Sequence, residues 1–287
     1  MTEQDLQQER ARRWRVDGNP IRTIEDARSF LRGVGFCLML PVRSLPVMPT
    51  FIGAYAGSAE GLPDAKHAFA DPRTSPATEL MVRLLRERSA YEINFLPETS
   101  LLVSASLFPF FYTLVGDRNP NAAPRIKAQG ATVSPLSVRV FEAIENRGAL
   151  SKGQLRELVG REMTTAALDR ALNELWSILK ITRVNYTESE GAYWDLLYRW
   201  SPETVKEGAQ LSLPEAISGL LGKYLESVVA ADQEEIEQFF LNLVSRTKIR
   251  EAINALLAGR QLKLITVGAK SLIYVPTQAD PRRRVHG

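Results

Sequence analysis

Few side chains in this sequence are of the types that carry out covalent or metal chemistry. The chain has a single cysteine, Cys37, and two histidines, His67 and His286. An ordinary zinc site needs three or four such ligands, and these three residues are widely separated along the chain. Cys37 lies in the apolar stretch GFCLML, which is typical of a buried thiol. The sequence therefore predicts no metal site and a buried Cys37, with a Cys–His pair as the alternative.

The short motifs that hold cofactors or organise hydrolysis are also absent. The sequence contains no GxGxxG, GxxxxGK[ST], HExxH or GxSxG string. These strings place glycines around phosphates, two histidines around zinc, or a serine on a sharp turn. We therefore expect no cofactor, and we assign no catalytic residue.

Basic side chains are the remaining chemical feature, and they are concentrated late in the chain. The formal net charge is only +3, which permits a polyanionic partner without arguing for one. Residues 226–237 are acidic, however, whereas residues 246–270 are basic apart from Glu251. Such cations can neutralise DNA phosphates, and ordinary helix electrostatics is the alternative. The candidate DNA-contacting residues are Arg246, Lys248, Arg250, Arg260 and Lys263, with Arg170, Lys180 and Arg183 as weaker candidates nearer the middle.

The elements that must position these cations follow a recognisable order. Ser134 and Pro135 suit the N-cap and first position of a helix that ends at Gly148. Ser151, and then Thr164 or Thr165, suit the N-caps of two more helices. KITRVNY, the polar TESEG and AYWDLLYRW predict a β-hairpin, whose aromatic residues we expect in the core. Three helices and a hairpin form a winged helix-turn-helix, in which the third helix reads DNA.

The same apolar pattern returns farther along the chain. One offset of 81 positions aligns all three helices and the start of the hairpin. A single offset maintained over this length predicts a duplicated module. Between the copies, SPETVKEGAQLSLP reads as a linker. The aligned pairs are Val140–Leu221, Ile144–Leu225, Leu155–Ile236, Leu158–Phe239, Leu168–Ile249, Leu172–Ile253, Leu175–Leu256 and Ile181–Leu262.

The first part of the chain is less regular. TIEDARSFLRGVGF predicts a helix that Thr23 caps, and ATELMVRLLRERSAYEINFLP predicts another. Whether this part of the chain forms a further winged helix stays open. We expect a mainly α protein with small β-hairpins, built from tandem winged helix-turn-helix domains. The expected domains are an N-terminal helical domain at 1–130, winged helices at 134–205 and 212–276, and a basic tail at 277–287.

Three stretches resemble the bacterial crosslink-repair DNA glycosylases of the YcaQ/AlkZ type. TIEDARSFLRGVGF resembles the opening helix of that family. RLLRERSAYEINFLPETSLLVSASLFPFFYTLV resembles the segment with a Leu-Pro and a Pro-aromatic pair. LGKYLESVVAADQEEIEQFF with IREAINALL resembles its late winged helix. The resemblance implies tandem winged helices with a small β domain, and hydrolysis of the glycosidic bond of alkylated or crosslinked bases.

The same resemblance points to positions at which this sequence departs from the family. The family acts through a Gln-x-Gln or Gln-x-Asp motif, and the matching stretch GFCLMLP, around Phe36, offers no amide or carboxylate. The family's aromatic–His pair is missing too, because Glu92 follows Tyr91. Glu92 and Glu98 are the only carboxylates considered for a lesion pocket, and a solvated or helix-bound carboxylate is the simpler interpretation of both. The resemblance therefore supports the predicted fold more strongly than it supports glycosylase activity.

The resulting expectation is a noncatalytic, duplex-DNA-binding protein related to these glycosylases. An active glycosylase with a displaced catalytic group is the first alternative, and a winged-helix module for protein interaction or transcription regulation is the second. The sequence has no apolar run of about 18 residues and no N-terminal signal pattern. We expect a cytoplasmic protein without membrane or metal partners, and we make no prediction of its oligomeric state.

Overall fold

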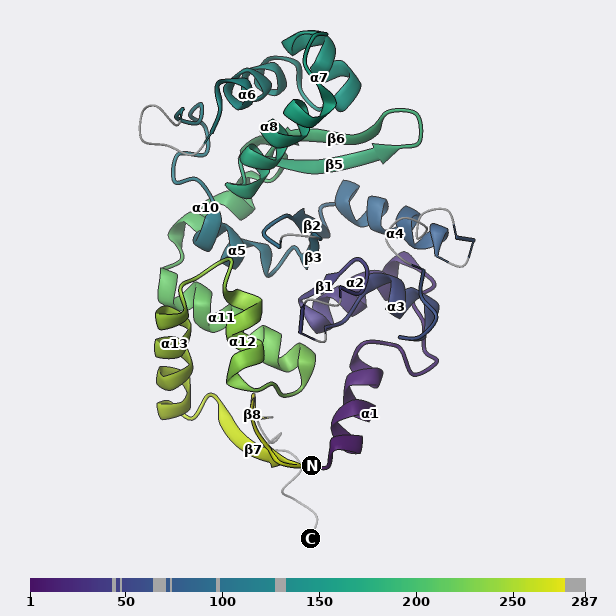
Figure 1. Cartoon of the computed structure of the whole chain (residues 1–287), viewed down its shortest axis with the longest axis vertical. Coiled ribbons are helices and arrows are strands. Elements are labelled where there is room, and N and C mark those ends of the chain that lie inside the picture. The colour runs from purple at the N-terminus through teal and green to yellow at the C-terminus, as the bar shows by residue number, and fades with distance from the viewer. Residues whose placement is uncertain are drawn as a thin grey trace.

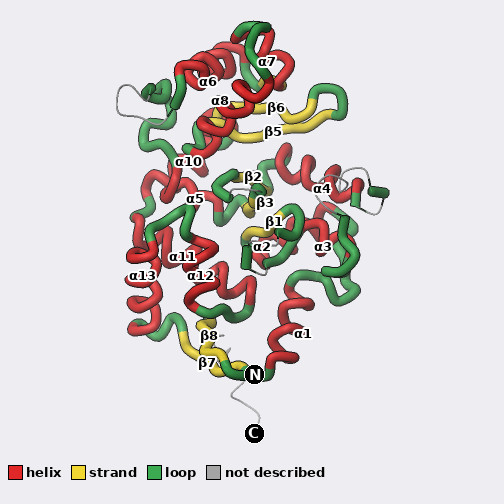
Figure 2. The backbone as a smooth tube through the Cα atoms, in the orientation of Figure 1, coloured by secondary structure: helices red, strands yellow, loops and turns green. Residues whose placement is uncertain are grey.

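The computed structural model describes residues 1–42, 45–46, 48–63, 71–72, 74–96, 99–126 and 133–276. Within them the protein is mainly helical, with three small antiparallel sheets, which confirms the predicted fold class. The middle module lies at one end of the molecule, and the N-terminal elements lie beside the last module below it (Figures 1 and 2). His67, His286, Glu98 and the predicted tail at 277–287 are outside the described residues.

The middle module is a winged helix with the predicted caps. The Ser134 side chain accepts a hydrogen bond from the Ser137 amide, and Pro135 occupies the first turn. Ser151 and Thr164 cap the next two helices in the same way. The strands pair antiparallel in the order β4-β6-β5. The elements are α6 (Pro135–Arg147), β4 (Leu150–Ser151), α7 (Lys152–Val159), α8 (Thr165–Ser177), β5 (Ile181–Thr187) and β6 (Gly191–Leu196).

The last module repeats this arrangement at the predicted offset. Displacing the bounds of α7 and α8 by 81 positions gives those of α12 and α13. The aligned apolar residues are buried in both modules, except that Leu158 is 45% exposed whereas Phe239 is fully buried. Ala231 bridges Ile273 at the place of β4. The elements are α11 (Leu213–Val228), α12 (Gln233–Phe240), α13 (Arg246–Ala258), β7 (Lys263–Val267) and β8 (Lys270–Tyr274).

The N-terminal part contains the same order of helices and strands a third time. From α2 onward it runs helix, strand, helix, helix and hairpin, and its sheet order β1-β3-β2 corresponds to β4-β6-β5. Thr23 caps α2 with a capping box, and Gly35 ends it with φ of 79°. The elements are α1 (Glu3–Arg13), α2 (Ile24–Val34), β1 (Phe36–Leu38), α3 (Phe51–Ala56), α4 (Ser75–Arg86), β2 (Ala90–Ile93), β3 (Leu101–Ser104) and α5 (Phe108–Val115).

Two predicted segments are wrong. The helix expected from ATELMVRLLRERSAYEINFLP ends at Arg86, and residues 90–93 form β2 because they pair with β3. The expected linker is helical over α10 (Pro202–Gln210), and it is preceded by α9 (Leu197–Trp200), at the end of the stretch AYWDLLYRW that was expected in the hairpin. The backbone of α10 packs closely on α5, because the Thr113 hydroxyl donates to the Gly208 carbonyl at 2.7 Å. The domain boundaries at 130, 205 and 212 stay a prediction.

Candidate nucleic-acid interface

The exposed cations of the last module form the first part of the candidate interface. Ser245 is the N-cap of α13 but makes no side-chain cap bond, and the first turn of α13 contains no acidic residue. The first amides of a helix lack intrahelical partners and favour anions. Cations beside such a terminus are unfavourable alone and favourable with a bound phosphate. The C-terminal basic set, all of it exposed, is Arg246, Lys248, Arg250, Arg260, Lys263 and Lys270.

Arg250 also has a structural partner within the module. Its Nε and Nη2 donate to the two carboxylate oxygens of Glu237 at 2.6 and 3.0 Å. This hydrogen bonding from Arg250 lowers the pKa of Glu237 below its ordinary value. The pair fastens α13 to α12, while the Arg250 side chain remains 57% exposed. The charge of Arg250 is therefore already partly neutralised, as is that of Lys270, whose ammonium lies 3.4 Å from a carboxylate oxygen of Asp232.

Lys180 was predicted to contact DNA, and the structure contradicts this. Its side chain is only 1% exposed. The ammonium donates to the carbonyls of Asn119, Pro120 and Ala122, and it lies 3.1 Å from a carboxylate oxygen of Asp117. Burial lowers the pKa of Lys180. The residue anchors the segment after α5 to the middle module, and it cannot reach a phosphate.

Arg183 also has partners within the protein, although its side chain is 34% exposed. Its Nη1 donates to Glu92 Oε1 at 2.7 Å, and its guanidinium carbon lies 4.4 Å from the ring centroid of Trp176 and 4.9 Å from that of Trp194. The Trp176 indole also donates to the Glu92 carbonyl at 3.0 Å. Both tryptophans are buried, as expected. These contacts join the wing of the middle module to β2.

The rest of the middle module gives little support for phosphate contact. Arg170 is exposed on α8, but Asp169 and Glu174 lie on the same open surface. The wing rests against the N-terminal part, because Arg86 at the end of α4 donates to the Asn185 side chain at 2.5 Å. Of the predicted middle residues, Arg170 is therefore the one that remains available to a ligand.

The stretch from Phe36 to Met39, at which the resemblance places a polar motif, is buried in the hydrophobic core. Phe36, Cys37, Leu38 and Met39 are 0, 0, 2 and 7% exposed. The Phe36 ring stacks on that of Phe239 in the last module, with centroids 5.4 Å apart and planes 5° from parallel. Aromatic packing of this kind stabilises the contact beyond its buried area. The stretch therefore joins two modules and is packed away from solvent.

Cys37 is expected to be unreactive in the folded protein. The thiol is fully buried in β1, and burial raises its pKa well above the ordinary value. Since the thiolate is the reactive form, a disulfide reagent at pH 8 should modify Cys37 only after denaturant is added. Rapid modification of the native protein, at the rate measured in denaturant, would contradict this placement of β1.

The comparisons with known proteins bear on these same modules. The family model described as DNA glycosylase AlkZ-like matches residues 69–286. The chain belongs to the AlkZ-like family. The solved structure of the DNA glycosylase AlkZ from Streptomyces sahachiroi is similar over 96% of this chain and 70% of that chain, with a TM-score of 0.61 and 15% sequence identity. No curated protein matches the chain significantly.

The AlkZ-like match confirms the resemblance drawn from the sequence and defines its extent. It covers the middle and last modules and also β2, which carries Glu92. It begins after β1, so the stretch from Phe36 lies outside it. Among the described residues, no cluster of three potential metal ligands occurs. None of the helices in the described ranges is long and apolar enough to cross a membrane.

Proposed function

We propose that this AlkZ-like chain binds duplex DNA through phosphate contacts and does not hydrolyse the glycosidic bond. The observation that carries the proposal is the burial of the four apolar residues from Phe36 to Met39. Glycosidic hydrolysis needs positioned polar groups that orient water and stabilise the developing sugar cation. The resemblance places those groups at this stretch, where the side chains are apolar and buried and the Phe36 ring stacks on Phe239 of the last module.

The contact with DNA is proposed for the C-terminal basic set. Arg246 and Lys248 lie in the first turn of α13, the counterpart of a recognition helix, and Lys263 and Lys270 lie on the wing. Helix and wing are the two elements with which winged helices approach a duplex. Because phosphate contacts carry no sequence information, the proposed binding is largely independent of sequence.

The alternative of an active glycosylase would require a carboxylate elsewhere. Glu92 is the candidate among the described residues, and it is 4% exposed. It accepts hydrogen bonds from Arg183 and from the Ser100 hydroxyl. A carboxylate held in this way is not directed at a substrate, so Glu92 supports the structural assignment rather than the catalytic one.

Incubation with alkylated and crosslinked duplexes is expected to give retention without base release. In one native gel, protein in excess should shift each duplex, and alkali treatment of the same samples should give no more strand scission than the protein-free control. Binding that is insensitive to salt between about 50 and 200 mM would contradict the phosphate contact and favour a protein-interaction module. Alkali-labile sites that accumulate with time would show that the noncatalytic assignment is wrong.

A further inference from the structure

The N-terminal helix α1 makes an unusual set of contacts with the end of α11. Arg10 donates from Nε to the Val228 carbonyl at 2.8 Å and from Nη2 to the Ala230 carbonyl at 2.7 Å. The Trp14 indole donates to the Ser227 carbonyl at 2.9 Å, and Arg13 donates to the preceding carbonyl. The last carbonyls of a helix lack intrahelical partners. Side chains of α1 and of its C-cap Trp14 therefore satisfy carbonyls at the C-terminus of α11.

The segment that Arg10 holds is strained and leads directly into the last module. Val229, the C-cap of α11, has φ of 71°, which is uncommon for a β-branched residue and costs free energy. Two residues later, Ala231 exchanges backbone hydrogen bonds of 3.0 and 2.8 Å with Ile273 in β8. The nearer contact of Arg10, the Ala230 carbonyl, is thus one residue away from the hydrogen bonds that fix the wing.

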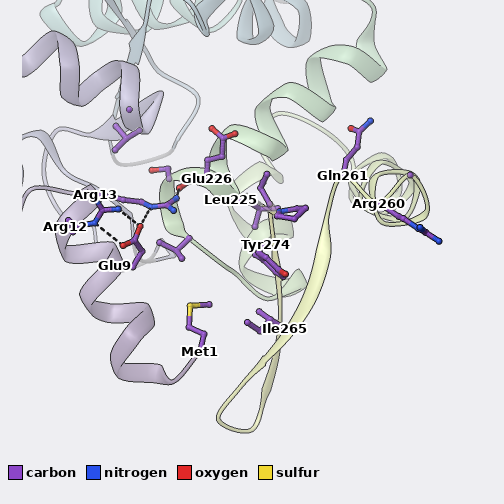
Figure 3. Close-up of a pocket in the computed structure, with 17 residues that line it drawn as sticks. Met1, Glu9, Arg12, Arg13, Leu225, Glu226, Arg260, Gln261, Ile265 and Tyr274 are labelled. Carbon is purple, nitrogen blue, oxygen red and sulfur yellow. Dashed lines mark hydrogen bonds and ion pairs between the residues drawn. The ribbon is translucent and has the colours of Figure 1, made fainter. Parts of the chain in front are cut away.

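The helix α1 also covers part of the wing formed by β7 and β8. Leu6 packs with Ala230, Val267 and Leu272 in a small apolar cluster apart from the main core. Figure 1 shows the N-terminus beside β7 and β8. Next to this cluster is a cavity of about 1310 Å³ between α1, the end of α11 and the wing (Figure 3). The joint is therefore not solidly packed, and a few specific contacts must hold the wing in place.

We propose that α1 is a clasp in which Arg10 acts as a positioning residue for the DNA-contacting wing. Arg10 is 8% exposed, so it cannot itself contact a phosphate. Arg10 donates to the carbonyls of Val228 and Ala230, and the next residue, Ala231, is hydrogen-bonded to β8. The strand β8 contains Lys270, and it pairs with β7, which contains Lys263. The part of this inference that concerns DNA rests on the proposed function, whereas the clasp itself does not.

Hydrogen exchange without DNA tests the clasp. In Arg10→Met, amides of residues 263–274 should exchange about tenfold faster or more, because hydrogen bonds to a charged donor are lost. Amides of β5 and β6 should be unchanged. Arg12→Met is the matched control, since Arg12 is on the same helix, is mostly exposed and pairs with Glu9. Arg10→Lys should restore much of the protection, because an ammonium can still donate to these carbonyls.

A double-mutant cycle on duplex affinity tests the positioning role. Arg10→Met should weaken binding about threefold to tenfold in the native background and in Lys248→Gln, which lies outside the wing. Arg10→Met should hardly change the affinity of the Lys263→Gln/Lys270→Gln variant, because the wing of that variant has already lost its two phosphate-contacting cations. A purely global destabilisation would instead give equal losses in all backgrounds.

The outcomes separate the clasp from the proposed function. Unchanged wing exchange in Arg10→Met, or equal affinity losses in every background, would overturn the clasp. If Arg10→Met accelerates exchange both in the wing and in β5 and β6, Arg10→Lys decides. A smaller residual acceleration that is confined to the wing supports the proposal, and equal acceleration in the wing and in β5 and β6 overturns it. Failure of the native protein to bind duplex would overturn the DNA-binding proposal, while the wing exchange would still decide the clasp.

Discussion

Arg183→Met is expected to lower the free energy of unfolding by about 2 kcal/mol, since removing the half-buried partner of the buried Glu92 carboxylate leaves that charge unpaired. Glu92 is the charge left behind, with a side chain that is 5% exposed. The substitution also removes the cation that lies over Trp176 and Trp194, a contact that is itself favourable. Urea unfolding followed by tryptophan fluorescence measures the change directly.

Two further variants decide whether the ion pair is the cause. Arg183→Met combined with Glu92→Gln should regain part of the loss, because a neutral amide is less costly to bury than an unpaired carboxylate. Arg170→Met, an exposed arginine of the same module, should change the unfolding free energy by less than about 0.5 kcal/mol. Equal losses for Arg183→Met and Arg170→Met would show that the contact with Glu92 contributes nothing.

The winged helices could be predicted because their signals are local. The cap residues Ser134, Ser151 and Thr164 lie next to the helices that they start, and each side chain accepts from an amide three residues ahead. The N-terminal winged-helix topology gave no such signal. Its strands β1, β2 and β3 have three or four residues each and are buried on both faces, so they show no alternation of apolar and polar residues.

The interface was harder to predict, because exposure depends on distant parts of the chain. Lys180 is enclosed by carbonyls of residues 119–122, about sixty positions earlier. The carboxylate that pairs with Arg183 is that of Glu92 on β2, 91 positions away. By contrast, Arg246 and Lys248 remain exposed in the first turn of α13. Charge type and helical position alone do not distinguish these cases, since the difference lies in tertiary packing.

The tertiary packing therefore concentrates the proposed DNA contact in the last module, and this has a measurable consequence. Arg246→Gln/Lys248→Gln is expected to weaken duplex binding about tenfold to a hundredfold at moderate salt. Each lost phosphate contact should also reduce the slope of log affinity against log salt by about 0.9. Neither residue is buried, so the unfolding free energy should change little.

A charge-matched control makes this result specific to the site. Arg156→Gln/Arg161→Gln removes the same charge from two exposed residues, one in the last turn of α7 and one just after its C-cap Gly160. A general effect of net charge would therefore appear equally in both variants. Fluorescence anisotropy with one duplex over a range of salt concentrations gives affinity and slope together. If the control weakens binding as much as Arg246→Gln/Lys248→Gln, the attraction is diffuse. A slope reduced by about two only in the latter would place two phosphates against the first turn of α13.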